Sequence, residues 1–277
     1  DDAVAFEVVQ RLGLAEAGDV IFRGVDVIMR REQAPLDQVG LHRLAQAYTP
    51  EDHYIAVRYA AQEALSAGIT TCHDWANALA DEADALAHCR ALVDSGIRAR
   101  FGYGRLPTPA SAPVSEGDLA AVQAWLDRHA QGRVDLGIVV HKVENLRAEV
   151  AAARAMGLKT IAPHVNLAND LDLLGPDFIF THGPGTPDGF MALLAQRGFK
   201  IGLCPATDPL IGAGLPPFLQ FLRNGVPFED IGFSVDVSCQ ACADPFAAMR
   251  TIKHSARIAQ QGGGNQDHQG DGGALLA

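Results

Sequence analysis

Short apolar runs alternate with longer amphipathic stretches along most of the chain, from about residue 50 to residue 261. Each run has the length of a buried strand, and each stretch repeats its apolar positions with the period of a helix. The seven runs are AGITTCHDW, IRARFGYG, VDLGIVV, LKTIAPHV, DFIFTHG, FKIGLCP and IGFSVDV. The stretches predict helices over 78–94, 116–129, 144–156, 187–197 and 244–261, with a further helix-like stretch ending at Asn224-Gly225.

Local signals agree with this division. Thr49-Pro50-Glu51-Asp52 is typical of a helix start, and Ser95-Gly96 and Gly157 are typical of helix ends. Seven strand–helix units indicate a parallel sheet, because each parallel crossover needs a connection as long as a helix. We therefore predict an α/β protein built as a (β/α)8 TIM-type barrel that is incomplete, with its first strand missing or unrecognised.

An open doubly wound sheet is the alternative arrangement of the same units. No GxGxxG or P-loop pattern follows any of the runs, which argues against the nucleotide-binding version of that sheet. The expected organisation has three regions. Residues 1–48 form a segment of unclear structure that contains the alternating run DVIFRGVDVIM, residues 49–262 form the barrel, and residues 263–277 form a flexible glycine-rich tail.

Composition narrows the class of partner. The chain has a formal net charge of −11 and no run rich in lysine or arginine, which argues against nucleic acid or an anionic membrane as a partner. No window approaches the ~18 continuous apolar residues of a membrane span. The five cysteines are odd in number, and only Cys239 and Cys242 have CxxC spacing, so a disulfide framework is not expected. We predict a cytoplasmic protein that acts on a small molecule.

Several residues that bind metals in other proteins stand at the ends of predicted strands. These residues are His73, His141, His164, His182 and Asp236. In a parallel barrel, working residues collect at the C-terminal ends of the strands, and imidazole and carboxylate suit a divalent metal that activates water. A single histidine there is usually structural, and a single aspartate often caps the next helix. Their convergence at equivalent places predicts a metal site.

The runs and their connections resemble one known family. FTHGPGTPDGFMALLAQRGFKIGLCPATD, then GAGLPPFLQFLRNGV, then GFSVDVSCQACADPFAAMR resemble the amidohydrolase superfamily, in its triazine-hydrolase and cytosine-deaminase-like branch. Upstream, ALSAGITTCHDWAN resembles the second-strand segment of that family and ARAMGLKTIAPHVN resembles its fifth. The resemblance covers roughly residues 49 to 258 and lies in the order and spacing of these segments.

The resemblance implies roles for individual residues. His164 is expected to be a metal ligand at the end of the fifth strand, and Asp236 is expected to bind the metal and take a proton from its water. His182 is expected to bind the water or the substrate and to polarise the substrate. Asp208, Trp75 and Asn77 are expected to line the substrate pocket. The predicted substrate site consists of these three residues and His182.

Two departures from the family pattern concern the metal. Relatives begin the barrel with a strand that ends in His-x-His, and no two histidines of this sequence are separated by one residue. The sequence after His164 reads HVNLANDLD, without the glutamate that many deaminases carry there. The flanking β-sandwich of the family is also not recognised. The pattern assigns no role to His73 or His141, which we interpret as structural or supporting residues.

We predict a metal-dependent hydrolase that acts on a C–N bond of a small heterocycle, as a deaminase or related amidohydrolase does. One divalent ion is expected, zinc first and iron second. The competing hypothesis is a non-catalytic or truncated amidohydrolase-like barrel with at most a ligand-binding role. A homo-oligomer is possible under both hypotheses, because an incomplete barrel exposes apolar edges.

Overall fold

The computed structural model describes residues 20–23, 26–29, 47–105, 108, 111–236 and 243–261. The chain divides into two compact units, which we call unit 1 (Asp1–Leu173) and unit 2 (Leu174–Ala277).

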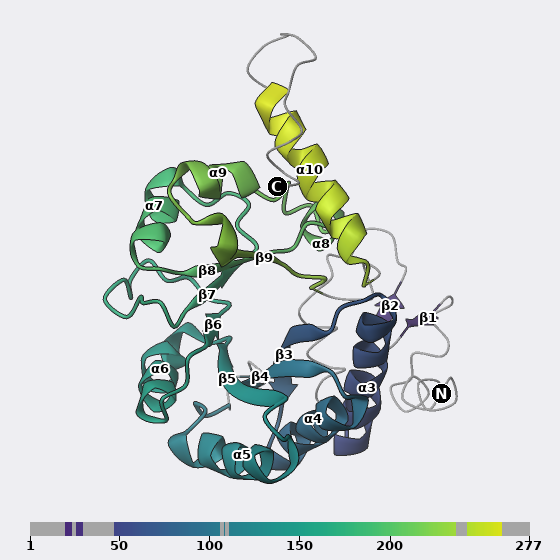
Figure 1. Cartoon of the computed structure of the whole chain (residues 1–277). Helices are drawn as coiled ribbons and strands as arrows, with labels where there is room; N and C mark the ends of the chain where they lie inside the picture. The colour runs from purple at the N-terminus through teal and green to yellow at the C-terminus, as the bar shows by residue number, and fades with distance from the viewer. Residues whose placement is uncertain are drawn as a thin grey trace. The chain divides into compact units, whose positions relative to one another are not determined.

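Unit 1 is built around one parallel sheet. Its elements are β1 (Val20–Arg23), β2 (Asp26–Met29), α3 (Pro50–Ser66), β3 (Thr71–Leu79), α4 (Glu82–Ser95), β4 (Arg98–Arg105), α5 (Glu116–His129), β5 (Val134–Val140), the 3-10 turn η1 (Val143–Asn145), α6 (Leu146–Ala155) and β6 (Ile161–Pro163). Strands β3, β4, β5 and β6 pair in that order, all parallel. Helices α4, α5 and α6 lie along one face of the sheet (Figure 1). Strands β1 and β2 form a separate antiparallel pair.

Several helix ends of unit 1 lie at the residues that the sequence indicates. The predicted start of α4 at residue 78 is wrong, because β3 extends to Leu79 and the helix begins at Glu82. Thr49 caps α3 in a capping box with Asp52, and Pro50 stands in the first turn, where its missing N–H has no cost. Ser115 and Asp118 form the same box at the start of α5. Gly96 ends α4 with φ of 82°, a left-handed conformation that glycine adopts without strain.

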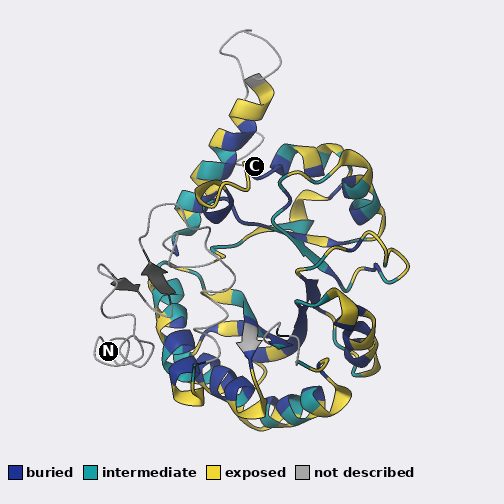
Figure 2. Ribbon diagram, turned by 180° about the vertical axis from the view of Figure 1, so that it is seen from behind, coloured by how far each residue is buried: buried dark blue, intermediate teal, exposed yellow. Residues whose placement is uncertain are grey.

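The core of unit 1 lies between the sheet and its helices, where buried residues gather (Figure 2). Phe101 and Tyr103 of β4 are fully buried, and the Phe101 ring lies 6.0 Å from the His88 ring of α4. Since side chains alternate across a strand, Gly102 lies on the opposite face of the sheet. A Cβ on Gly102 would stand 2.6 Å from Val139 Cγ2 and 2.9 Å from His73 Nε2. Glycine is therefore required for His73 to lie against this face.

A row of polar side chains in contact with one another, the polar chain, crosses the core of unit 1. His53 of α3 bonds through Nδ1 to Nε2 of His88 at 3.1 Å, and His88 Nδ1 lies 3.3 Å from Asp74 Oδ2 of β3. His53 Nε2 also lies 3.7 Å from Asp84 Oδ2. The His53 side chain is 4 % exposed, and burial, with the neighbouring His88, lowers its pKa to about 4. These contacts tie α3 and α4 to the sheet.

Unit 2 has a second parallel sheet. Its elements are β7 (Ile179–Thr181), α7 (Asp188–Gln196), β8 (Lys200–Leu203), α8 (Thr207–Leu210), α9 (Phe218–Arg223), the 3-10 turn η2 (Phe228–Asp230), β9 (Ile231–Phe233) and α10 (Pro245–Gln261). The strands pair in the order β7-β8-β9 (Figure 1). Phe178, Phe199 and Phe221 are fully buried and form much of its core with Met191 and Leu194.

Each of the seven predicted strand segments overlaps a strand, β3 to β9, and all the pairings among these seven strands are parallel. The first strand was placed too early: β3 extends to Leu79, so His73 lies within it and does not end it. The α/β class is therefore confirmed, and helices alternate with the strands except between β6 and β7, where residues 164–178 contain no helix. Closure of the strands into a barrel stays a prediction, as do the region boundaries at residues 48 and 262. Residues 263–277 and most of residues 1–48 lie outside the described residues, and so does the Cys239–Cys242 pair.

Among the described residues, no helix combines the length and the apolar composition that a membrane span requires.

Candidate metal centre

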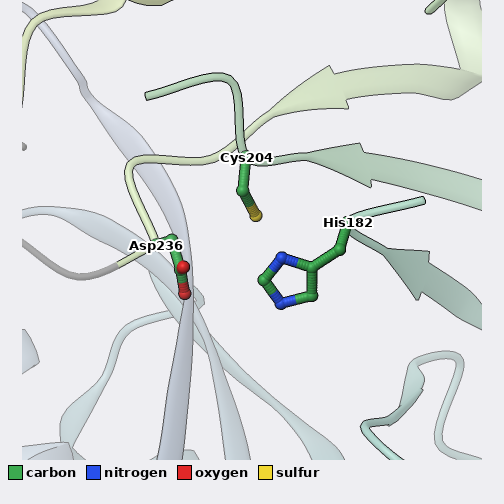
Figure 3. Close-up of side chains that lie close together, drawn as sticks. All are labelled: His182, Cys204 and Asp236. Atoms are coloured by element: carbon green, nitrogen blue, oxygen red, sulfur yellow. The ribbon is translucent and has the colours of Figure 1, made fainter. Parts of the chain in front are cut away.

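Three side chains with metal-binding atoms follow the three strands of unit 2. His182 comes directly after β7, Cys204 directly after β8, and Asp236 three residues after the end of β9. Because the strands are parallel neighbours, their C-terminal ends bring these residues to one edge of the sheet. Figure 3 shows the three side chains directed toward a common space.

The three side chains are close enough to share one ion. One ligand atom of each, an imidazole nitrogen, the Cys204 sulfur and a carboxylate oxygen, lies within 4.8 Å of the other two. Among the described residues, this is the one such group of three or more histidine, cysteine and acidic side chains. Cys204 is almost fully buried and forms no disulfide.

A buried carboxylate orients His182. Asp208, in the short helix α8, is fully buried and lies with Oδ1 2.8 Å from Nδ1 of His182. This hydrogen bond, with a smaller contribution from Cys204, raises the pKa of His182 to about 10. The Asp208 contact holds one ring nitrogen, Nδ1. Metal-binding histidines commonly have a carboxylate partner of this kind, which fixes the tautomer and the ring orientation.

The backbone is strained at two of the three positions. His182 has φ of 66° and Asp236 has φ of 64°, a left-handed conformation that costs energy for residues other than glycine. Within the described part of the chain, Gln131 is the only other non-glycine residue with positive φ. Such strain gathers at functional sites, where the surrounding structure holds it. The strained backbone at His182 and Asp236 therefore lies at the same edge of the sheet as the group of three side chains.

The pKa values of Cys204 and Asp236 are also shifted. Burial raises the pKa of the Cys204 thiol, although the nearby His182 opposes that shift. Burial likewise raises the pKa of Asp236, and the closeness of Asp208 adds to it while His182 lowers it. A divalent cation among these side chains would favour the thiolate and the carboxylate, since both carry negative charge.

A second group of aromatic and imidazole rings lies in unit 1, with His73 and Trp75 within β3, His141 directly after β5 and His164 directly after β6. Trp75 of β3 donates from Nε1 to Nδ1 of His73 at 3.0 Å. The Trp75 ring centroid lies 6.0 Å from that of His164 and 6.4 Å from that of His141. The His141 and His164 rings are 5.5 Å apart. Burial lowers the pKa of His73 to about 4, so His73 is a neutral acceptor for the indole.

The predicted site residues therefore fall into two groups. His182, Asp208 and Asp236 lie together in unit 2, as the sequence indicates. His164 and Trp75 lie together in unit 1, joined by His73 and His141, to which the sequence pattern assigned no role. The backbone of Asn77 belongs to β3, but its side chain lies outside the described residues. That His164 and Asp236 share one ion stays a prediction.

Sequence reasoning missed Cys204. In the run FKIGLCP it reads as one more apolar core residue, since free cysteine is among the most buried residue types. Its position gives the available signal, because Cys204 ends its strand just as His182 ends the preceding one. Asp74 and Asp84 were also passed over, and their contacts with His53 and His88 belong to the core.

The chain was compared with known proteins. No family model matches it. It is 28 % identical to a 5-methylthioadenosine/S-adenosylhomocysteine deaminase of Natronomonas pharaonis over 227 residues, which cover 70 % of this chain and 51 % of the relative. The chain thus spans about half the length of the curated relative that it matches.

Solved structures give the same picture of the fold. An adenosine deaminase of Xanthomonas campestris with bound zinc has a TM-score of 0.67 and 17 % identity, over 83 % of this chain and 57 % of that one. A variant of the atrazine chlorohydrolase of Arthrobacter aurescens, solved with zinc and atraton, has a TM-score of 0.61 and 18 % identity, over 80 % of this chain and 57 % of that one. At these identities the likeness concerns the fold.

The match to deaminases agrees with the likeness in fold. The predicted resemblance to the amidohydrolase superfamily is confirmed as a resemblance, since the curated relatives are deaminases and the structural neighbours include an atrazine chlorohydrolase, an adenosine deaminase and an amidohydrolase. The strand-end position of His182 and Asp236 agrees with the roles that this resemblance implies.

Proposed function

We propose that the chain forms part of a metal-dependent hydrolase that cleaves the C–N bond of an aminated heterocycle. The observation that carries the proposal is the group of His182, Cys204 and Asp236 at one edge of a parallel sheet, with His182 held by Asp208. The matches to deaminases support the reaction type.

The side chains present fit a divalent ion. An imidazole nitrogen, a thiol sulfur and a carboxylate oxygen are the three ligand types that zinc takes in proteins, and a catalytic zinc keeps three protein ligands and one open position. The donor set of unit 2 supplies one of each type. When bound, such an ion activates water for attack on an electrophilic carbon.

The residues of this chain then have separate tasks. Asp236 accepts the proton of the attacking water at a carboxylate oxygen, and its raised pKa suits a group that must take up and release a proton. Asp208 keeps the His182 ring in one orientation by holding Nδ1. Buried Cys204 and Asp208 keep water away from the inner side of the group.

The substrate class follows from the relatives' chemistry. We propose an adenosine with a modified 5′ carbon, because the matched relative is named for 5-methylthioadenosine and S-adenosylhomocysteine. Hydrolysis replaces the exocyclic amino group by an oxygen from water and releases ammonia. Trp75 and Asn77 remain proposed substrate-binding residues. A planar indole such as that of Trp75 suits stacking on a purine.

The test is ammonia release from adenosine, 5′-methylthioadenosine and S-adenosylhomocysteine by zinc-loaded protein. We expect turnover that falls by at least about 10²-fold in Asp236→Asn, since a group that moves a proton contributes this much or more. The matched control is Asp127→Asn, which changes an exposed carboxylate of α5 and should leave turnover unchanged. Equal turnover in Asp236→Asn and wild type would refute the proposal, and absence of turnover in the zinc-loaded wild type would favour the non-catalytic alternative.

A further inference from the structure

The side chains of His73 and Trp75 lie on the face of the unit 1 sheet opposite to helices α4, α5 and α6 (Figure 1). Side chains alternate across a strand, so Asp74, which stands between the two, points to the other face, where it contacts His88 of α4. In the parallel pairing of β3 with β4, Trp75 stands beside Gly102. Since glycine has no side chain, β4 places none beside the indole at this level of the face.

The Trp75 ring lies near the C-terminal ends of the neighbouring strands. It contacts the rings of His141 and His164, which directly follow β5 and β6, with interplanar angles of 78° and 85°. Both contacts are edge-on, so neither imidazole is stacked on the indole. Trp75 is also partly exposed. A partly exposed and unstacked indole at this end of a parallel sheet is suited to stacking on a planar ligand.

One hydrogen bond fixes the direction of the Trp75 indole, from its Nε1 to Nδ1 of His73 at 3.0 Å. Residues two apart in a strand are separated by about 6.6 Å. The two ring centroids are 5.8 Å apart, so the indole leans along the strand toward His73. An indole N–H can only donate, and Nδ1 of His73 therefore carries no proton. The Trp75 side chain has no second hydrogen-bonding group, so it can bind a ligand only through its ring.

His73 occupies its position at a cost to stability. Its Nε2 is buried and has no hydrogen-bond partner among the described residues. An apolar side chain of similar size would avoid the free energy that a buried, unpartnered N–H costs. The position also requires Gly102, because a Cβ there would stand 2.9 Å from Nε2 of His73. The group that His73 supplies in return is the acceptor at Nδ1.

We propose that His73 is a positioning residue, which accepts the indole N–H of Trp75 and so holds the ring for stacking on the purine of the substrate. The proposal rests on the proposed function in that it takes the ligand to be a 5′-modified adenosine. It gives His73 a task in ligand binding, where the sequence pattern assigned it none. Stacking reads the flat face of a base, so Trp75 should bind the amino-bearing substrate and the oxygen-bearing product alike.

Trp75 itself can report ligand binding. The chain has two tryptophans, and Trp125→Phe leaves Trp75 as the only indole. We expect 5′-methylthioadenosine, titrated into the full chain with this change, to quench the Trp75 fluorescence in a saturable manner. In the otherwise unchanged chain, Trp75→Ala should weaken the binding measured by calorimetry by about 10-fold or more, since stacking a base on an aromatic side chain contributes this much.

A matched pair of variants separates the hydrogen bond from packing. Leucine and asparagine have nearly the same size and shape, but only asparagine supplies an acceptor where His73 has Nδ1. In the Trp125→Phe chain, His73→Leu should weaken binding by about 5-fold, as loss of one neutral hydrogen bond does, and should shift the NMR signal of the indole N–H. His73→Asn should restore both toward the wild-type values. Circular dichroism of the two variants checks that they fold.

Three outcomes would overturn the proposal. Unchanged binding in His73→Leu would show that the hydrogen bond does not serve the ligand. Equal weakening in His73→Leu and His73→Asn would show that the ring of His73 has a structural role only. In His73→Leu the loss should be the same for 5′-methylthioadenosine and 5′-methylthioinosine, and a loss confined to the first would mean that His73 acts on the amino group and not through Trp75.

Failure of this proposal is distinguishable from failure of the proposed function. Ammonia release without quenching of Trp75 leaves the hydrolase standing and removes His73 and Trp75 from substrate binding. Quenching without ammonia release retains the stacking site and removes the deaminase reaction. If 5′-methylthioadenosine neither quenches Trp75 nor releases ammonia, both proposals are refuted.

Discussion

The buried histidine His53 makes a specific prediction about pH and stability. Its pKa is about 4 in the folded chain, against 6.5 for an ordinary histidine. Between these two values the unfolded chain binds a proton that the folded chain does not. The free energy of unfolding therefore falls as the pH falls through this range, and the full contribution is present above pH 6.5. Replacing His53 with glutamine removes this proton uptake and keeps a polar partner for His88.

The size of the effect follows from the two pKa values. A fall from 6.5 to about 4 corresponds to about 3 kcal/mol when complete. Between about pH 7 and about pH 4.5 the loss from His53 is about 2.5 kcal/mol. With a urea dependence of about 2 kcal/mol per molar, the unfolding midpoint of the wild type should move by about 1 M more than that of the variant.

Tryptophan fluorescence is the suitable assay. The chain has two tryptophans, Trp75 and Trp125, and both belong to unit 1, so the signal reports the unit that contains His53. Urea unfolding is followed at a series of pH values for wild type and His53→Gln. The pKa of His73 is also lowered, and the pKa of Glu149 is raised to about 6, but both groups are present in both proteins and cancel in the difference.

His129→Gln is the control, because His129 is an exposed histidine of the same unit. It stacks on Trp125 with ring centroids 4.3 Å apart, so its replacement changes the fluorescence amplitude and leaves the pH dependence of the midpoint intact. Parallel pH dependences in wild type and His53→Gln would show that His53 is not held neutral by burial, and the reasoning would be refuted.

The remaining predictions concern two glycines of unit 1 and the contact between Asp208 and His182 in unit 2. Gly102→Ala should destabilise unit 1 by about 1–3 kcal/mol, because its Cβ would meet Val139 Cγ2 at 2.6 Å and His73 Nε2 at 2.9 Å. Gly117→Ala, in helix α5 and with no contact closer than 3.5 Å, should instead stabilise it by about 0.5–1 kcal/mol, and urea unfolding compares the two. Asp208→Asn should move the pKa of His182 from about 10 toward 6.5, measured by NMR of the imidazole in metal-free protein. An unchanged His182 titration would remove Asp208 as the cause.

Much of the fold follows from periodicity alone. The seven apolar runs contain β3 to β9, and the capping residues Thr49 and Ser95-Gly96 mark helix ends that the structure keeps. Parallel pairing follows from the length of the connections. The division into two units was not predicted, although it falls in the connection between β6 and β7, for which the sequence predicts no clear helix.

Sequence reasoning singled out residues whose type and position in a motif indicate a function. His182 and Asp236 were singled out because they stand near strand ends and match a family pattern, and the structure brings them together. Their roles stay a prediction. The polar chain from His53 through His88 to Asp74 was not found, because its members are separated by up to 35 residues and meet only when α3 and α4 pack on the sheet. Cys204 was not singled out because a cysteine in an apolar run reads as one more core residue.

The left-handed backbone at His182 and Asp236 has a consequence for evolution and for engineering of the chain. Glycine at either position would relieve roughly 1–2 kcal/mol of steric strain. A selection that rewards thermal stability alone should therefore favour loss of the two side chains that the proposed site requires. Libraries of this protein need a screen for bound metal or turnover in every round, since the most heat-resistant clones are expected to include inactive ones.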